Sequence, residues 1–250
     1  MTGLGLHVER GGTGADLVVL LHGLGATGAV WHRLARAIEA RGRRWIAPDL
    51  RGHGRSPSAG PFGFGLHAAD VATLLRDEDP ARVTLLGHSF GGVVGALLAG
   101  GLFGPLPARL VTLGVKLTWS EADLAGARAA AQRPARVFAT RDDAQERYAR
   151  IAGLHGLVAP EAPEMAGGVT AVEGGYALAM NPGVFSAADA SVPDLLRRVR
   201  VPLRMAAGAE DPMVTLAEMT AIAPAARLLP GQLHNAQITA PEAVLALLDP

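Results

Sequence analysis

The segment Gly87–Gly91 constrains this chain more than any other, because its glycine-x-serine-x-glycine pattern stands between a strand and a helix. Residues 82–86 before it are mostly aliphatic and β-branched, as in a buried strand. Residues 92–99 after it are small and apolar, which predicts a helix. A serine in such a turn has a strained backbone that lifts its hydroxyl clear of the sheet, and the glycines prevent Cβ collisions with neighbouring elements. We therefore expect Ser89 at a tight turn between a buried strand and a helix.

Strand and helix patterns alternate along most of the chain. Apolar strands are predicted at residues 17–21, 44–47, 82–86, 109–113, 203–207 and 227–229. Helices are predicted at residues 30–40, 67–76, 92–99 and 241–248. Continuous apolar strands that alternate with helices predict a mostly parallel sheet with helices on both faces.

Residues 117–185 interrupt this alternation with helix patterns and no convincing strand. Ser120–Asp123 and Thr140–Asp143 both have the form of a capping box, with aspartate in place of glutamate. We therefore divide the chain into an α/β core at 1–116 and 186–250, with a helical insertion at 117–185.

Composition excludes several function classes. The chain has 250 residues, 49% of them hydrophobic, a formal net charge of zero and no cysteine. Zero net charge offers no electrostatic basis for binding nucleic acid or an anionic membrane. The lack of cysteine excludes disulfides, thiolate metal sites and a cysteine nucleophile. With no secretory signal and no apolar stretch fit to span a membrane, we expect a cytoplasmic protein without metal or cofactor.

A serine hydroxyl needs a base, usually a histidine that a carboxylate orients. Asp211 follows the strand at 203–207, and His234 follows the strand at 227–229. Because the carboxyl ends of parallel strands share one edge, these loops can meet Ser89 despite their separation in sequence. We expect Ser89 as nucleophile, His234 as base and Asp211 as its orienting acid. Glu210 is the alternative acid, but Pro212 favours Asp211 by defining the turn.

The other histidines have no comparable pattern around them. His155 lies in the insertion without a carboxylate partner, and His88 adjoins the serine, where packing or a hydrogen bond within the turn is the simpler role. We expect His7, His32 and His67 at surface or helix-face positions.

Acyl transfer also requires two N–H groups that face the developing negative charge. The backbone N–H of Phe90, at the start of the helix after the serine, is one candidate, and the helix dipole assists it. The loop His22–Gly25, which follows the strand at 17–21, should supply the other. We select the N–H of Leu24.

Together these segments resemble the α/β-hydrolase superfamily, particularly its lidded esterase, lactonase and carbon–carbon hydrolase branches. The motifs that carry the resemblance are His22–Gly25, Pro48–Ser56, Gly87–Gly92, Gly208–Asp211 and Gly231–His234. The resemblance implies a doubly wound, mostly parallel sheet with a helical lid between the sixth and seventh strands, which residues 117–185 would form. It also implies that Asp49 and Arg51 are structural. Serine at position 89 excludes relatives that use an aspartate there, such as dehalogenases and epoxide hydrolases.

A lid lines the pocket beneath it, so apolar residues of the insertion are candidates for substrate contact. These candidates are Trp119, Phe138, Tyr148, Leu154, Tyr176 and Met180. They predict a largely hydrophobic pocket for the acyl or alcohol part of a substrate.

The sequence thus predicts a serine hydrolase that cleaves a small carboxylic ester or lactone through an acyl-enzyme. One alternative is a carbon–carbon bond hydrolase or lyase of the kind that acts on meta-cleavage products. Ala26 and Thr27 disfavour it, because they replace the proline and glycine typical of that branch. An alternative of another class is a small-molecule receptor that retains the triad. The sequence makes no prediction of oligomeric state.

Overall fold

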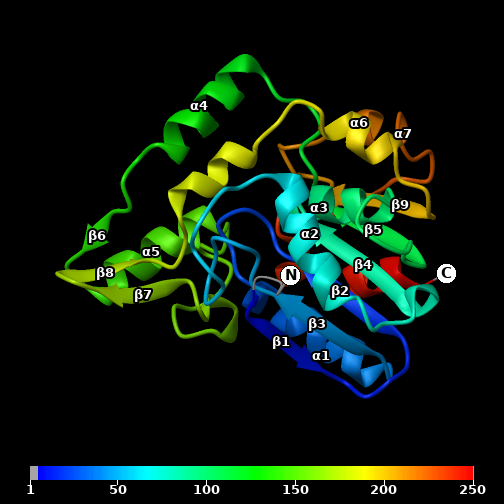
Figure 1. Ribbon diagram of the computed structural model, residues 1–250, viewed down its shortest axis with the longest axis horizontal. Helices are drawn as coiled ribbons and strands as arrows, with labels where there is room; N and C mark the ends of the chain where they lie inside the picture. The colour runs from blue at the N-terminus through cyan, green and yellow to red at the C-terminus, as the bar shows by residue number, and fades with distance from the viewer. Residues whose placement is uncertain (1–4, 250) are drawn as a thin grey trace.

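Seven strands form the central sheet in the computed structural model, which describes residues 5–249 (Figure 1). Their order across the sheet is β1-β3-β2-β4-β5-β9-β10, and β1 alone of these seven is antiparallel to its neighbour. The strands are β1 (Val8–Gly11), β2 (Leu17–Leu21), β3 (Arg44–Pro48), β4 (Val83–His88), β5 (Arg109–Leu113), β9 (Leu203–Gly208) and β10 (Arg227–Leu229). The expected mostly parallel, doubly wound sheet is confirmed.

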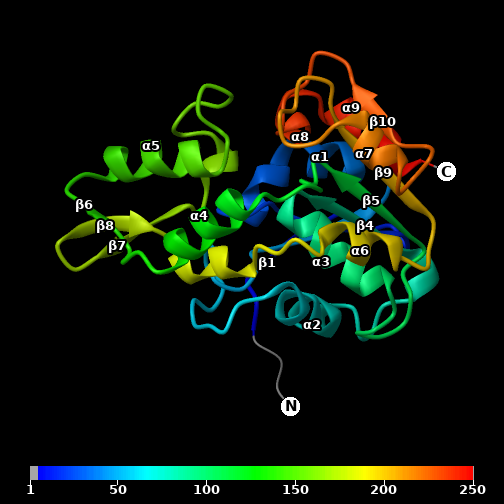
Figure 2. The same cartoon turned by 90° about the horizontal axis from the view of Figure 1, so that it is seen from above.

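Helices cover both faces of this sheet (Figure 2). One face carries α2 (Phe64–Leu74), α3 (Phe90–Ala99) and α6 (Val192–Arg197), and α7 (Leu216–Thr220) packs against β9. The other carries α1 (His32–Ala40), α8 (Ala236–Thr239) and α9 (Pro241–Leu245). Short 3₁₀ helices are η1 (Gly28–Trp31), η2 (Pro80–Arg82) and η5 (Ala246–Leu248).

The alternation of side chains along a strand explains why both faces are apolar. In β2, Leu17, Val19 and Leu21 join the core beneath α3, whereas Val18 and Leu20 join the core beneath α1. Successive side chains of a strand point to opposite faces, so a strand buried on both sides must be apolar at every position.

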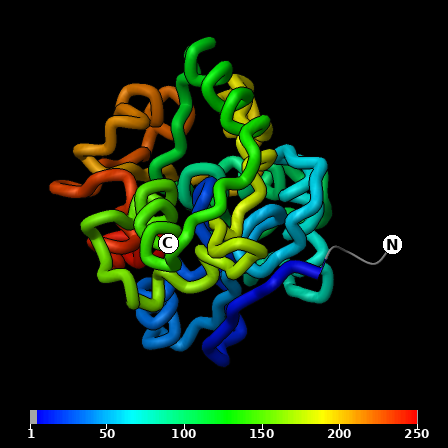
Figure 3. Tube along the Cα trace, turned by 90° about the vertical axis from the view of Figure 1, so that its left-hand side faces the viewer, coloured from blue at the N-terminus to red at the C-terminus, as the bar shows by residue number. Residues whose placement is uncertain are grey.

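The insertion lies between β5 and β9, beyond the carboxyl ends of the core strands (Figures 1 and 3). Its elements are α4 (Glu121–Ala131), β6 (Val137–Phe138), α5 (Arg141–Ile151), η3 (Pro163–Met165), β7 (Val169–Val172), β8 (Gly175–Leu178) and η4 (Pro182–Ala187). Helix α4 begins with a complete capping box formed by Ser120 and Asp123, and Thr140 accepts the N–H of Asp143 at the start of α5.

The insertion differs from the sequence prediction in two ways. It contains a three-stranded antiparallel sheet, β6-β8-β7, so the expectation of a purely helical insertion is wrong. These strands have two to four residues, too few for an alternating pattern to stand out. The insertion also has another place in the strand count. Among the described strands of the central sheet, taken in chain order, it lies between the fifth and the sixth, whereas the family resemblance implied a place between the sixth and the seventh.

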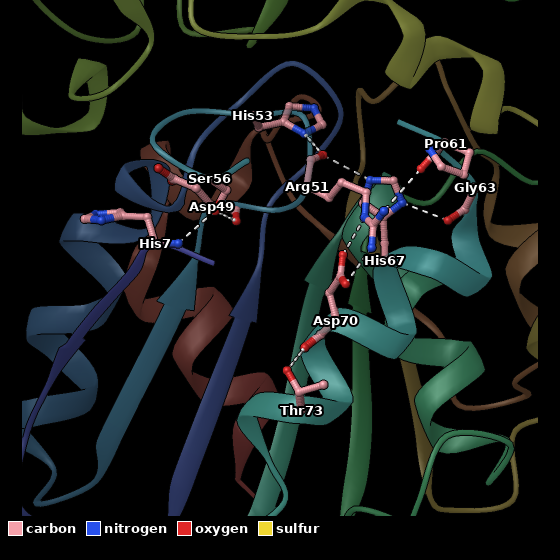
Figure 4. Close-up of polar contacts among 10 residues, drawn as sticks. All are labelled: His7, Asp49, Arg51, His53, Ser56, Pro61, Gly63, His67, Asp70 and Thr73. Carbon is pink, nitrogen blue, oxygen red and sulfur yellow. Dashed lines mark hydrogen bonds and ion pairs between the residues drawn. The ribbon is translucent and has the colours of Figure 1, made fainter. Parts of the chain in front are cut away.

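The loop after β3 is held by two charged side chains. The Asp49 carboxylate accepts the N–H groups of Gly28 at 2.7 Å and Arg55 at 2.9 Å. The Arg51 guanidinium forms a bidentate ion pair with Asp70 on α2, with N···O distances of 2.6 and 2.7 Å (Figure 4). Both contacts shape the loop, in keeping with a structural role for Asp49 and Arg51.

Histidine 67 lies on a face of helix α2, one of the two expected positions, but that face is buried, so a surface position is wrong. Its Nδ1 lies 2.8 Å from the carbonyl oxygen of Gly63, and its Nε2 lies 3.2 Å from that of Arg51 (Figure 4). The edge of the ring also meets the Phe90 ring at a centroid distance of 4.9 Å. The carbonyls of Gly63, directly before α2, and of Arg51, in the loop after β3, satisfy the imidazole, and a helical pattern does not reveal such partners.

The close approach of α3 to β2 yields a stability prediction. A Cβ atom on Gly91 would collide with the carbonyl oxygen of Leu21, which is fixed in the sheet. We expect Gly91→Ala to lower the free energy of unfolding by about 3 kcal/mol, because the helix must move off the strand. Gly126→Ala is the matched control. No other heavy atom of the described chain lies within 4 Å of its added Cβ, so it should stabilise the exposed helix α4 by about 0.5–1 kcal/mol. Urea unfolding measures both, and equal effects would contradict the collision.

The buried histidines predict sensitivity to mild acid. Burial lowers the pKa of His22 from 6.5 to about 4, and it also lowers the pKa values of His53, His67 and His88. Below pH 6.5 the unfolded chain therefore binds protons that the folded chain does not. The free energy of unfolding should therefore be highest above that pH and decrease toward pH 4. His22 alone should account for a loss of about 3 kcal/mol.

Urea midpoints between pH 4 and pH 8 test this expectation. The variant His67→Gln, which lacks one buried imidazole, should show a shallower decrease. A midpoint that stays constant from pH 7 to pH 5 would contradict the prediction.

Candidate active site

Ser89 occupies a strained turn between β4 and α3. Its φ of +49° is the one positive value among the non-glycine residues that the structure describes. Such a backbone typically costs about 1–3 kcal/mol and persists only where the surroundings impose it. Here the N–H of Ser89 donates to the carbonyl of Leu113 at 2.8 Å, and the carbonyl of Ser89 accepts the N–H of Gly92 at 3.0 Å. A Cβ on Gly87 would collide with the backbone of Gly91, so the turn requires glycine there.

His234 and Asp211 form a hydrogen-bonded pair. His234 Nδ1 lies 2.8 Å from Asp211 Oδ2, and Asp211 Oδ1 accepts the N–H of Met213 at 2.9 Å. The Asp211 carboxylate is fully buried, whereas 26% of the His234 side chain is exposed. Both carboxylate oxygens are therefore held, and Nε2 of His234 makes no hydrogen bond within residues 5–249. Glu210, the alternative acid, has an exposed side chain that forms no ion pair with His234.

A glycine at the end of β5 makes room for this pair. Gly114 has a φ of +62°, and a Cβ there would lie 3.0 Å from Asp211 Oδ2 and 3.1 Å from His234 Nδ1. No motif in the sequence pointed to Gly114. A glycine directly after a predicted strand was the available signal.

Ser89 and His234 line one cavity of about 360 Å³, and Leu24 and Phe90 line it as well. A Cβ added to Gly23 would lie 3.4 Å from Ser89 Cβ, so the loop before Leu24 packs directly against the serine. The N–H groups of Leu24 and Phe90 donate no hydrogen bond to another group of the described chain. Two unpaired donors thus border the same cavity as the serine hydroxyl.

Most of the remaining cavity wall is apolar. Side chains of the core contribute Phe64, Val93, Val115, Val192 and Met213, and the insertion contributes Trp119, Ala127, Ile151, Ala152 and Phe185. Lys116, in the segment after β5, also lines the cavity and pairs with Asp123 of the insertion at 2.9 Å.

The structure revises the set of substrate-contact candidates, because Trp119 alone of the six lines this cavity. Phe138 and Tyr176 pair across β6 and β8, and Met180 bridges to His53. Tyr148 and Leu154 are buried in the core that α5 shares with the central sheet. Tyr148 and Leu154 thus belong to the shared core, and Phe138 and Tyr176 to the small sheet of the insertion. Phe185 and Ile151 occupy the cavity wall instead.

Two neighbours support the His234 loop. His88 Nε2 lies 3.0 Å from the carbonyl oxygen of His234, and burial lowers the pKa of His88 well below 6.5. The expected hydrogen bond within the turn at Ser89 is thus wrong, because the partner of His88 belongs to the loop after β10. Asn235 donates from Nδ2 to the carbonyl of Gly153 at 3.0 Å and accepts from Gln237 at 2.8 Å. Asn235 therefore fastens the His234 loop to the end of α5, a contact that no sequence pattern indicated.

The structure holds neither a cluster of metal ligands nor a membrane-spanning element in the part that it describes. Within residues 5–249, no three or more histidine, aspartate or glutamate side chains are grouped closely enough to hold an ion. Over the same residues, no helix has both the length and the apolar character needed to cross a membrane.

The known proteins similar to this chain include a lipase and a methyl ester esterase. Lipase LipV of Mycobacterium tuberculosis is 42% identical over 95 residues, which are 38% of this chain and 36% of the lipase. A pimeloyl-acyl-carrier-protein methyl ester esterase of Aeromonas hydrophila is 45% identical over 98 residues, again 38% of this chain and 36% of the relative. The matched stretch thus spans about a third of these curated relatives.

A solved structure covers much more of the chain. The crystal structure of E-2-(acetamidomethylene)succinate hydrolase has a TM-score of 0.79 at 22% identity and covers 96% of this chain and 92% of its own. At this identity the likeness concerns the fold. A family profile described as the alpha/beta hydrolase fold matches residues 16–241. With most of its length matched, this chain belongs to the α/β-hydrolase family.

Proposed function

We propose that this protein is a serine hydrolase that cleaves a carboxylic ester or lactone with a largely apolar portion through an acyl-enzyme. The observation that carries the proposal is the His234–Asp211 pair, 2.8 Å between Nδ1 and Oδ2, because His234 lines the same cavity as Ser89. Similarity to a lipase and to a methyl ester esterase supports ester cleavage.

In the proposed mechanism, Ser89 Oγ attacks the carbonyl carbon while Nε2 of His234 takes the hydroxyl proton. Asp211 accepts from Nδ1 and stabilises the imidazolium that forms. The carbonyl electron pair moves to oxygen, and the N–H groups of Leu24 and Phe90 bind this oxyanion.

Collapse of the tetrahedral intermediate completes acylation. The bond to the leaving alkoxide breaks, and His234 delivers its proton to that oxygen. Water then attacks the acyl-enzyme as His234 takes a proton from it. A second collapse releases the acid and restores the Ser89 hydroxyl. For a lactone, the leaving oxygen stays attached to the acyl group, and a hydroxy acid is the product.

Substitution of the reacting groups gives the first test. We expect Ser89→Ala to lower kcat on a p-nitrophenyl ester by at least about a thousandfold with an unchanged circular dichroism spectrum. It should also abolish labelling by a fluorophosphonate, whereas Ser58→Ala, an exposed serine, should leave labelling intact. Asp211→Asn should lower kcat by about 10⁴, because the imidazole loses its orienting acceptor.

Glu210→Gln is the matched control for the acid, since it removes the neighbouring carboxylate alone. Wild-type activity in that variant is the expected result. Strong loss in Glu210→Gln with little loss in Asp211→Asn would reverse the assignment of the acid. Persistent labelling of Ser89→Ala would refute the nucleophile.

The apolar cavity predicts the preferred acyl group. Across p-nitrophenyl esters of increasing chain length, kcat/KM should rise by up to about threefold for each methylene, until the chain fills the 360 Å³ cavity. Phe185→Ala removes part of the wall and should move the optimum to longer chains. Tyr176→Ala alters an aromatic residue of the same insertion that does not line the cavity, so its optimum should match wild type.

Two outcomes would contradict this substrate class. One is a preference for charged, hydrophilic acyl groups over apolar ones. The other is turnover of a vinylogous diketone with none of the esters hydrolysed.

A further inference from the structure

Two buried histidines hold the backbone on either side of Leu24. His22 Nδ1 lies 2.8 Å from the carbonyl oxygen of Gly23, which belongs to the same peptide group as the Leu24 N–H. In the next peptide group, the N–H of Gly25 points at His53 Nε2 at 3.1 Å. Both imidazoles are nearly inaccessible to solvent. The direction of the Leu24 N–H is therefore set by side-chain contacts on both sides.

The partners of each ring define which nitrogen carries the proton. A carbonyl oxygen can only accept, so His53 Nδ1, 3.0 Å from the carbonyl of Arg51, carries the hydrogen (Figure 4). His53 Nε2 then has the lone pair that accepts from Gly25. In the same way, His22 Nε2 accepts the N–H of Leu50 at 2.9 Å and leaves Nδ1 as the donor. Burial favours the neutral form in both rings by lowering their pKa values.

Polarisation adds to this geometry. The Gly23 carbonyl accepts from His22 and also from the N–H of Ala26 at 3.2 Å. Hydrogen bonds to the carbonyl of a peptide group make its N–H a stronger donor. The N–H concerned is that of Leu24, which borders the cavity beside Ser89.

The backbone of His53 is also paired with the insertion. His53 and Met180 form an isolated antiparallel bridge. On one side of it the N–H of Asn181 donates to the carbonyl of Gly52 at 2.9 Å, and on the other the N–H of Gly54 donates to the carbonyl of Ala179 at 2.6 Å. The insertion therefore holds the backbone whose side chain reaches the Leu24 loop.

We propose that His53 is a positioning residue, which orients the Leu24 N–H toward the oxyanion. Through its backbone contacts, His53 makes this orientation depend on segment 179–181 of the insertion. The inference rests on the proposed function, in which the Leu24 N–H stabilises the transition state. No sequence pattern assigned His53 a role, since it stands inside a loop motif that the family resemblance explains as a turn.

Replacement of His53, whose Nε2 accepts the N–H of Gly25, is the central experiment. Phenylalanine at this position keeps an aromatic ring but cannot accept from Gly25, whereas the side-chain oxygen of glutamine can replace Nε2. On the best p-nitrophenyl ester, His53→Phe should lower kcat by about tenfold to a hundredfold, with KM within about twofold of wild type. His53→Gln should recover most of that loss, which a purely space-filling role would not produce.

Thr27→Val is the matched control. Thr27 is buried, donates from Oγ1 to the carbonyl of Ala166 at 2.9 Å and lies 3.3 Å from the Tyr148 hydroxyl, so the variant removes other contacts between core and insertion while keeping the hydrogen bonds of His22 and His53. Its kcat should stay within about twofold of wild type. An unchanged kcat in His53→Phe, a change in KM alone, or an equal loss in Thr27→Val would each overturn the proposal.

Asn181→Pro tests the coupling to the insertion. The φ of Asn181 is −78°, which proline accepts, so this change removes the N–H that donates to Gly52. Asn181→Ala controls for loss of the side chain. We expect a lower kcat in Asn181→Pro than in Asn181→Ala, and no further loss when Asn181→Pro is added to His53→Phe. Equal kcat values in the two Asn181 variants, or full additivity with His53→Phe, would refute the coupling.

A readout independent of turnover separates this inference from the proposed function. In ¹⁵N-labelled wild-type protein, scalar coupling across the hydrogen bond should link the Gly25 amide to Nε2 of His53. Absence of that coupling would refute the inference whatever the activity. Presence of the coupling without hydrolysis of any ester or lactone would refute the proposed function and, with it, the oxyanion role. Ester hydrolysis with an unaltered kcat in His53→Phe would refute the positioning role alone.

Discussion

The close packing of α3 against β2 and β4 around Ser89 is the constraint on which the rest of the site depends. A side chain at Gly87 or Gly91 would collide with backbone atoms, so the turn forms only with glycine at both positions. That packing keeps Ser89 at a φ of +49° and leaves the N–H of Phe90 unpaired at the start of α3. The strain of one residue is thus offset by a buried apolar interface that extends over three elements.

The parallel sheet brings the other residues of the site to this turn, although no local sequence pattern links them. Loops that follow β2, β5, β9 and β10 meet at one edge, where Gly114 leaves room for the Asp211–His234 pair. Buried imidazoles then connect these loops, His88 to the backbone of His234 and His53 to that of Gly25. The site is consequently supported by neutral histidines, which makes its integrity dependent on pH as well as on packing.

Prediction from sequence succeeded where the information is local. The strands of the core, the turn at Ser89 and the loops that carry Asp211 and His234 follow from apolar runs and glycine positions within a few residues. Prediction from sequence failed where the position of a side chain depends on which part of the structure it packs against. Phe138 and Tyr148 had the composition of a pocket wall, yet both are buried away from the cavity, and Tyr148 joins the core that α5 shares with the central sheet. Strands β6, β7 and β8 are too short to show an alternating pattern, and His67 is held inside the protein in part by the carbonyl of Arg51, which belongs to the loop after β3.

The sequence by itself determined the fold class, the order of the core elements and the loops in which the candidate reactive groups lie, because periodicity and turn chemistry are properties of neighbouring residues. Only the tertiary structure decided which carboxylate meets His234, which side chains enclose the cavity and how the insertion contacts the loop of Leu24. Those outcomes depend on distances between segments far apart in the chain. The contact between Gly25 and His53 illustrates this, since 28 residues separate the two and a hydrogen bond of 3.1 Å joins them.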